Sequence, residues 1–172
     1  MIEKSTIEHV LNIFFDCPSR EFYLRELSRE LKLSMPTIVS TTDKLSKENL
    51  IIKTKGKALT KVIANRDNPE FIRLKRIYNL ENAYISGLVD YLSNAYNHPK
   101  TMILFGSFSK GEDIEKSDID IAVITPKRMS LDLKEYEKEL KRIINIHEVE
   151  LDNVSKEFKT NLYNGIILEG SL

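Results

Sequence analysis

Residues 102–124 constrain the fold of this chain more than any other stretch. The stretch opens with a short apolar run that ends at Phe105, and Gly106-Ser107 interrupts it. A second apolar run covers residues 119–124 and carries Asp118 and Asp120 at its start. Two short apolar runs separated by turn-forming residues predict two buried strands with a loop or helical turn between them.

The two acids of this stretch are expected to act together. Side chains alternate between the faces of a strand, so Asp118 and Asp120 project to one side, about 6–7 Å apart. Ionised carboxylates at that separation repel each other unless a cation neutralises them. Mg²⁺ prefers such hard oxygen ligands, together with substrate phosphates and water. Gly106-Ser107, before a predicted helical turn, offers backbone N–H groups and a hydroxyl to phosphate oxygens.

Gly106-Ser107, ten residues, and then Asp118-Ile119-Asp120 within an apolar run resembles the signature of the nucleotidyltransferase superfamily related to DNA polymerase β. The finer pattern, residues 105–111 followed by Ser117, resembles the small stand-alone group called minimal nucleotidyltransferases. The alternative interpretation is an acidic turn on an ordinary α/β hairpin. That alternative does not explain why two acids share one face of an apolar strand.

The resemblance implies a reaction and a set of roles. A nucleoside monophosphate would pass from an NTP to an acceptor hydroxyl of a protein, an RNA or a small molecule, and pyrophosphate would leave. Asp118 and Asp120 would hold Mg²⁺, with two ions expected. Gly106 and Ser107 would bind the β- and γ-phosphates, and Lys110 would add a positive charge or simply be a solvated lysine.

The family pattern also includes a third acid on a neighbouring strand. The predicted strand of residues 144–151 offers Glu148 and Glu150 on one face, with His147 on the opposite face. Glu148 is the preferred third catalytic and metal-binding acid because it lies nearer the strand's centre, Glu150 is the second choice, and loss of the third acid is the remaining alternative. His147 is expected to be a core or surface residue.

The first third of the chain predicts three helices and a basic β-hairpin, an order that resembles a winged helix-turn-helix. Ser34 is expected to cap the third helix. In this family the third helix enters the DNA major groove and the hairpin touches phosphates. The residues expected to face the core from the third helix are Met35, Ile38, Val39 and Leu45, and those expected to meet DNA are Thr37, Ser40, Thr41, Lys44, Lys53, Lys55 and Lys57. A protein-binding or dimerisation module is the alternative, and the lysines then form a solvated edge.

The predicted architecture is α+β, with a winged helix-turn-helix domain at residues 1–67. Residues 68–172 would form a helical connector and a small α/β nucleotidyltransferase domain with a mixed sheet, whose core covers about residues 100–172. Residues 1–67 carry 12 basic and 9 acidic side chains, whereas the remainder carries 14 and 17. The positive excess therefore falls on the part expected to meet nucleic acid.

Composition predicts a cytoplasmic protein. Hydrophobic residues make up 41% of the chain and charged residues 30%, which is typical of globular proteins. One cysteine, Cys17, allows no internal disulfide, and neither a membrane span nor a signal peptide is expected.

The expected partners are an NTP, double-stranded DNA, a toxin protein or RNA acceptor, and a second copy of the chain in a homodimer. An antitoxin-like component of a toxin–antitoxin pair would combine these roles. The alternative function is a DNA-binding transcriptional regulator whose nucleotidyltransferase-like domain senses nucleotide or is inactive.

Overall fold

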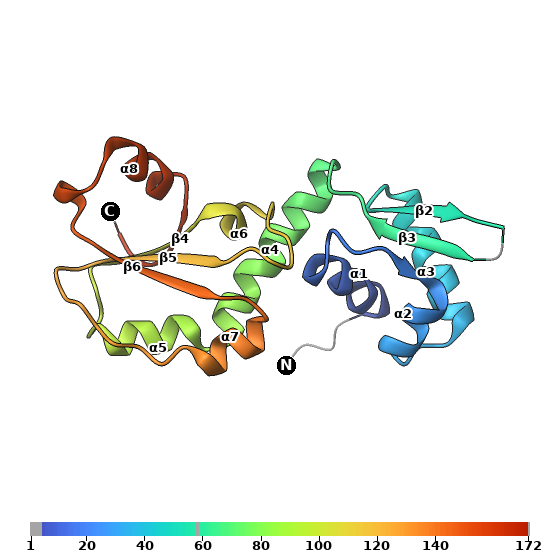
Figure 1. Cartoon of the computed structure of the whole chain (residues 1–172), viewed down its shortest axis with the longest axis horizontal. Helices are drawn as coiled ribbons and strands as arrows, with labels where there is room; N and C mark the ends of the chain where they lie inside the picture. The colour runs from blue at the N-terminus through green and yellow to red at the C-terminus, as the bar shows by residue number, and fades with distance from the viewer. Residues whose placement is uncertain (1–4, 58, 172) are drawn as a thin grey trace. The chain divides into compact units, whose positions relative to one another are not determined.

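The computed structural model describes residues 5–57 and 59–171 and contains two compact units, Met1–Lys75 and Arg76–Leu172 (Figure 1). The division falls within helix α4 (Pro69–Ile85). The predicted domain boundary at residue 67 lies just before this helix. The assignment of a separate function to each side of that boundary stays a prediction. Helices and strands occur in both units, which confirms the α+β class.

Before α4, the described residues of the first unit form three helices and three strands, and the strands pair antiparallel. They are α1 (Thr6–Asp16), β1 (Phe22–Tyr23), α2 (Leu24–Glu30), α3 (Met35–Lys47), β2 (Ile51–Lys55) and β3 (Thr60–Ala64). The strand order is β1-β3-β2, and the short strand β1 was not predicted. The element order is the one that a winged helix-turn-helix implies, and that assignment stays a prediction.

Local sequence explains where these helices begin. Ser5 and Glu8 form a capping box at α1, and the Ser34 hydroxyl accepts the Thr37 N–H at 3.3 Å at the start of α3. Phe14 and Phe22 pack edge to face, with ring centroids 5.6 Å apart, in the core of the unit. Ile38 and Leu45 are buried as predicted, but Met35 and Val39, expected in the core, are exposed.

The second unit holds a four-stranded mixed sheet, as predicted. After α4 come α5 (Leu88–Ala95), β4 (Thr101–Phe105), α6 (Gly106–Lys110), β5 (Ile119–Ile124), α7 (Lys134–Leu140), β6 (Ile144–Val149), η1 (Leu151–Asn153), α8 (Lys156–Tyr163) and β7 (Ile166–Gly170). The strand order is β6-β5-β4-β7. Only β5 and β6 run parallel, and the other pairs are antiparallel.

Alternating side chains of this sheet form two apolar clusters. Met102 and Leu104 of β4 pack on one face with residues of α5 and α7, whereas Ile103 and Phe105 pack on the other face with residues of α8. Figure 1 shows α5 and α7 on one side of the sheet and α8 on the other. In β5, Ile119 and the alternate residues after it point to the α5 face, so the face of α8 is left for Asp118 and Asp120.

Within the described residues, the structure contains no helix with the length and apolar character required to cross a membrane.

Candidate functional site

The Gly-Ser motif and the acid pair meet at one point of the sheet. Phe105, the last residue of β4, is the Cα partner of Asp120 on β5. Gly106 follows with φ +75°, and a Cβ built on it would lie 2.8 Å from Asp120 Oδ2. A glycine is therefore required here for two reasons, since L side chains disfavour this φ and the Asp120 carboxylate occupies the space. Ser107 is half-buried as the second residue of α6.

Two residues of β6 contact the acid pair. Asn145 is the Cα partner of Asp120, and its Nδ2 lies 3.1 Å from Asp118 Oδ2 and 3.3 Å from Asp120 Oδ1. His147 Nε2 lies 3.1 Å from Asp120 Oδ1. The imidazole ring is also packed against Phe105 and Phe158, with centroids 5.1 and 6.0 Å away. One amide donor thus joins both carboxylates, and an imidazole held between aromatic rings contacts the second carboxylate.

The structure corrects the prediction for Glu148. This residue lies on the opposite face of β6, where its Oε1 accepts hydrogen bonds from the Tyr96 hydroxyl at 2.8 Å and the Met129 N–H at 2.6 Å. Arg128 approaches Glu148 Oε2 at 3.6 Å. Burial, with the Glu148 hydrogen bond adding to it, raises the pKa of Tyr96, so the phenol stays protonated and donates. Glu148 therefore anchors the segment after β5 rather than pointing toward Asp118 and Asp120.

The prediction for His147 is corrected as well. This residue was expected to point away from the acid pair, but it lies on the same face as the pair and contacts Asp120. The alternation of Glu148 with His147 was predicted correctly, but the face assigned to each was not. The missing information was the parallel register, which places Asn145 opposite Asp120 and His147 opposite Ala122. The apolar-polar alternation from Ile144 to His147 places Asn145 and His147 on one face of the strand, but it does not say which face meets Asp120.

The remaining predicted residues of this unit do not contact the acid pair. Glu150 is exposed at the start of η1, where its Oε2 accepts a hydrogen bond from Asn153 Nδ2 at 3.3 Å. Lys110 is exposed in the last turn of α6. Lys110 therefore remains a candidate for a phosphate contact, whereas Glu150 does not replace Glu148 as a third acid.

The donor set suits a cation that arrives with a nucleotide. Among the described residues, no group of three or more His, Cys, Asp or Glu side chains is arranged to hold a metal ion. Mg²⁺ in proteins is commonly bound by one or two carboxylates plus substrate phosphates and water. Asp118 and Asp120 provide two carboxylates beside Gly106 and Ser107, so the residues fit a cation that phosphate oxygens help to coordinate.

In the first unit, four predicted DNA-contacting residues of α3 line one open hollow of about 570 Å³. Ser5, Thr6 and Ile7 of the α1 end contribute to the same hollow, and the α3 residues are Thr37, Ser40, Thr41 and Lys44. Thr41 is only 5% exposed, so the expectation that it faces outward is wrong. The cause is the helix phase, since Thr41 and Thr42 join Ile38 and Leu45 on the buried face.

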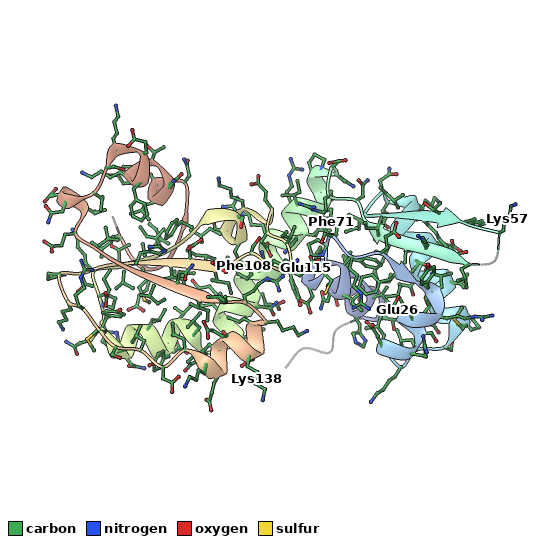
Figure 2. The ribbon with its side chains drawn as sticks, in the orientation of Figure 1. Glu26, Lys57, Phe71, Phe108, Glu115 and Lys138 are labelled. Atoms are coloured by element: carbon green, nitrogen blue, oxygen red, sulfur yellow. The ribbon has the colours of Figure 1, made fainter. Side chains whose placement is uncertain are left out.

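The three hairpin lysines differ in their surroundings. Lys53 Nζ lies 2.8 Å from Asp43 Oδ1 and 3.1 Å from Thr42 Oγ1, and its side chain is 9% exposed. The hydrogen bond from Lys53 lowers the pKa of Asp43. Lys55 and Lys57 are exposed, and Figure 2 shows Lys57 near the end of the hairpin. Lys53 therefore braces the hairpin against α3, whereas Lys55 and Lys57 are free to meet a ligand.

A known protein family matches the C-terminal part of the chain. Residues 88–172 match the family described as polymerase beta, nucleotidyltransferase. The match supports placing the C-terminal part of the chain in the nucleotidyltransferase superfamily, with a general function in nucleotidyl transfer, and it covers the sheet that carries Gly106, Asp118 and Asp120. Neither the curated proteins nor the solved structures include a significant match.

Proposed function

We propose that the second unit binds an NTP with Mg²⁺ and transfers its nucleoside monophosphate to an acceptor hydroxyl. The observation that carries this proposal is the closeness of Gly106 to the Asp120 carboxylate, since a Cβ added to Gly106 would lie 2.8 Å from Asp120 Oδ2. The turn proposed to bind phosphate lies next to the carboxylate proposed to bind a cation. This arrangement suits a triphosphate whose charge is neutralised by that cation.

Each residue then has a role that its position allows. The Ser107 hydroxyl and the adjacent backbone N–H groups bind the β- and γ-phosphates. Lys110 adds positive charge near the triphosphate. Asp118 and Asp120 would hold Mg²⁺, which supplies neutralisation of charge on the triphosphate when it is bound. Asn145 orients both carboxylates and His147 orients Asp120, since these are the groups within hydrogen-bonding distance of each.

The chemical step is an in-line displacement at the α-phosphorus. The acceptor oxygen forms a bond to this phosphorus, the bond from it to the bridging oxygen of the β-phosphate breaks, and pyrophosphate leaves. Positioning and charge neutralisation provide most of the rate in phosphoryl chemistry. A small site of this kind can therefore carry the reaction without a large substrate domain.

The test uses the 172-residue chain with Mg²⁺ and each α-labelled NTP in turn. We expect pyrophosphate release and labelled acceptor with wild type, and loss of both with Asp120→Asn. Asp152→Asn, an exposed acid in η1, is the matched control and should behave as wild type. Calorimetry with Mg²⁺ and NTP should show binding even when no acceptor is present. Absence of nucleotide binding by the wild type would refute the proposal.

A second candidate function is a DNA-binding regulator, including an autoregulating toxin–antitoxin component, in which the second unit senses nucleotide or is inactive. Two observations favour it: Asn145 and His147, neither of them an acid, occupy the surroundings of the acid pair, and Lys55 and Lys57 are exposed on the hairpin. Binding to duplex DNA should weaken with salt by about 0.9 log units per log unit for each phosphate contact. An affinity for duplex DNA that does not change with salt would exclude this role. A monomer in solution would exclude the expected homodimer.

A further inference from the structure

The loop between α6 and β5 contains one half of a buried ion pair to which the proposed function gives no role. Asp113 lies in this loop and is 1% exposed, whereas its neighbour Glu112 is exposed and Ile114 is half-buried. Asp113 Oδ2 lies 3.6 Å from Arg142 Nη2, and both side chains are almost fully buried. Arg142 comes from the segment that leads into β6. The pair therefore joins two segments that both end at the acid pair.

The position of Asp118 depends on this loop. Asp120 is held in the sheet by its pairing with Phe105, whereas Asp118 precedes the first residue of β5 and lies outside the strand pairings. The loop closes into a turn just before Asp118, because the Ile114 N–H donates to Ser117 Oγ at 3.0 Å and the Ser117 N–H donates to the Ile114 carbonyl at 2.9 Å. Asp113 immediately precedes this turn and attaches it to the rest of the unit.

One oxygen of Asp113 connects the loop to α6. Asp113 Oδ1 accepts a hydrogen bond from Asn79 Nδ2 at 2.7 Å, and the same nitrogen donates to the Phe108 carbonyl at 2.9 Å. Asn79 belongs to α4 and is 2% exposed. Phe108, which Figure 2 labels, directly follows Ser107 in α6. One buried amide therefore bridges the loop that ends at Asp118 and the helix that carries the Gly-Ser motif.

The other oxygen of Asp113 connects the loop to β6. Its partner Arg142 lies three residues before Asn145, whose Nδ2 contacts Asp118 Oδ2 at 3.1 Å. The residue after Arg142 is tied to β5 directly, since the Ile143 carbonyl accepts the Ile119 N–H at 2.8 Å. The Asp113 carboxylate thus links the α6 side and the β6 side of the acid pair, one oxygen to each.

A buried ion pair is a weak means of stabilising a fold. Desolvation of the two charges offsets much of their attraction, and replacing such a pair by apolar side chains of similar volume is often neutral or stabilising. A carboxylate differs from an apolar side chain in having two oxygens with fixed directions, here one toward Asn79 and one toward Arg142. The pair is therefore better explained by the geometry that it imposes on the loop than by its contribution to stability.

We propose that Asp113 is a positioning residue that fixes the spacing between Ser107 and Asp118. This inference rests on the proposed function, in which Ser107 binds the phosphates and Asp118 binds the cation. Ser107 can hold the phosphates while Asp118 shares their Mg²⁺ only when this spacing is correct. Asp113 therefore determines how strongly Mg²⁺ and NTP reinforce each other's binding, which is a coupling free energy between two ligands.

The test compares ATP binding in Mg²⁺ with ATP binding in EDTA, by calorimetry on the 172-residue chain. The first variant, Asp113→Asn with Arg142→Met, removes both charges and keeps an acceptor for Asn79. We expect Mg²⁺ to strengthen ATP binding by the wild type at least about tenfold. The variant should bind ATP in EDTA within about twofold of the wild type and should lose most of the gain from Mg²⁺.

A second variant and a control separate positioning from folding, with urea unfolding measured on every protein. Asn79→Leu removes the amide between the loop and α6 and should also reduce the gain from Mg²⁺, so it carries the test if the first variant does not fold. Ser93→Ala is the control, since Ser93 is 6% exposed and donates to Glu169 Oε1 at 2.9 Å. Glu169 pairs with Met102, near the end of β4 that is remote from Gly106. The control should keep the gain from Mg²⁺ even if it loses stability.

The outcomes distinguish this inference from the proposed function. An unchanged gain from Mg²⁺ in the variants would overturn the positioning role and leave the proposed function intact. Equal losses of ATP affinity in Mg²⁺ and in EDTA, or a reduced gain in Ser93→Ala as well, would show a merely structural effect and would also overturn it. A wild type that binds no ATP in either condition would refute the proposed function, and the positioning role with it.

Discussion

His147 Nε2 lies 3.1 Å from Asp120 Oδ1, so an imidazole approaches the acid pair from the strand on which a third carboxylate was expected. Asn145 completes this arrangement from the same face of β6. Neither group is a carboxylate, so the site offers a cation two carboxylates rather than three.

Introducing a carboxylate at position 145 should strengthen cation binding. Asn145→Asp places a third acid beside Asp118 and Asp120. The repulsion among three neighbouring carboxylates is relieved when a cation binds between them, so the added acid should favour the cation-bound form. We expect the affinity for Mn²⁺ without nucleotide, measured by electron paramagnetic resonance, to rise about tenfold, or about 1.4 kcal/mol.

The control for that substitution is Asn153→Asp, which adds the same charge at an exposed position in η1. An equal gain in both variants would indicate a general effect of net charge rather than a site. No gain in Asn145→Asp would show that the two native acids do not bind a cation together.

Gly106→Ala should weaken nucleotide binding as well as stability. The substitution imposes a positive φ on alanine and pushes a Cβ to 2.8 Å from Asp120 Oδ2. Gly87→Ala is a matched control, because Gly87 has the same φ of +75° and no atom within 4 Å of its Cβ position. Both variants should lose about 1–2 kcal/mol of unfolding free energy from the backbone alone. Reduced NTP affinity by calorimetry is expected in Gly106→Ala, and a similar reduction in Gly87→Ala would contradict the proposed contact.

Glu148→Ala should destabilise the second unit without abolishing nucleotide binding. The substitution leaves the Tyr96 hydroxyl and the Met129 N–H without their acceptor, and an unpaired polar group costs about 1–3 kcal/mol. Urea unfolding measures the loss, and Glu150→Ala, at an exposed residue, should change stability by less than about 0.5 kcal/mol. If Glu148→Ala kept its stability and lost NTP binding, Glu148 would be a site residue after all.

The unfolding free energy should depend on alkaline pH because Tyr96 is buried. Because burial raises the pKa of this phenol in the folded chain, its contribution to stability is complete below the ordinary value near ~10. Above that pH the unfolded chain ionises first, and the contribution falls as pH rises toward the folded pKa. The unfolding free energy of wild type should therefore decrease more steeply between about pH 9 and 11 than that of Tyr96→Phe. Tyr163→Phe, at an exposed tyrosine, should follow the wild type.

Substitutions of the hairpin lysines should have different effects, on DNA binding for Lys55 and on stability for Lys53. Lys55→Ala is expected to lower the slope of DNA affinity against salt by about one, with little change in stability. Lys53→Ala removes the partner of Asp43 and Thr42 and should lower thermal stability, because its side chain is 9% exposed. Equal effects of the two substitutions on the salt slope would show that Lys53 also reaches phosphates.

Sequence patterns predicted the sheet well, because its strands are short apolar runs with breaks that local chemistry explains. Gly106-Ser107 and Asp118-Ile119-Asp120 come together as expected, since one antiparallel pairing, Phe105 with Asp120, is enough to place them. The surroundings of the pair could not be predicted, because β6 pairs with β5 in parallel after a long crossover. Alternation fixes which side chains share a face of β6, but a register is needed to say which face meets Asp120.

A similar limit explains the error on α3. Thr41 and Val39 are both acceptable on either face of a helix, and the pattern of apolar residues favoured burying Val39. Thr42 is instead buried and donates its hydroxyl to the Ile38 carbonyl at 2.7 Å, so a threonine satisfies its own polar group inside the core. Hydrophobicity alone cannot identify this arrangement.

The parallel pairing of β5 with β6 has a consequence for how such a protein can diversify. The acid pair and its neighbours Asn145 and His147 are fixed by strand register, whereas Lys138 and Lys141 belong to the crossover between the strands. A crossover can change in length and side chains while both strands keep their places. The surroundings of the acid pair are thus held by the sheet, whereas the surface that the crossover presents can change by mutation without moving them.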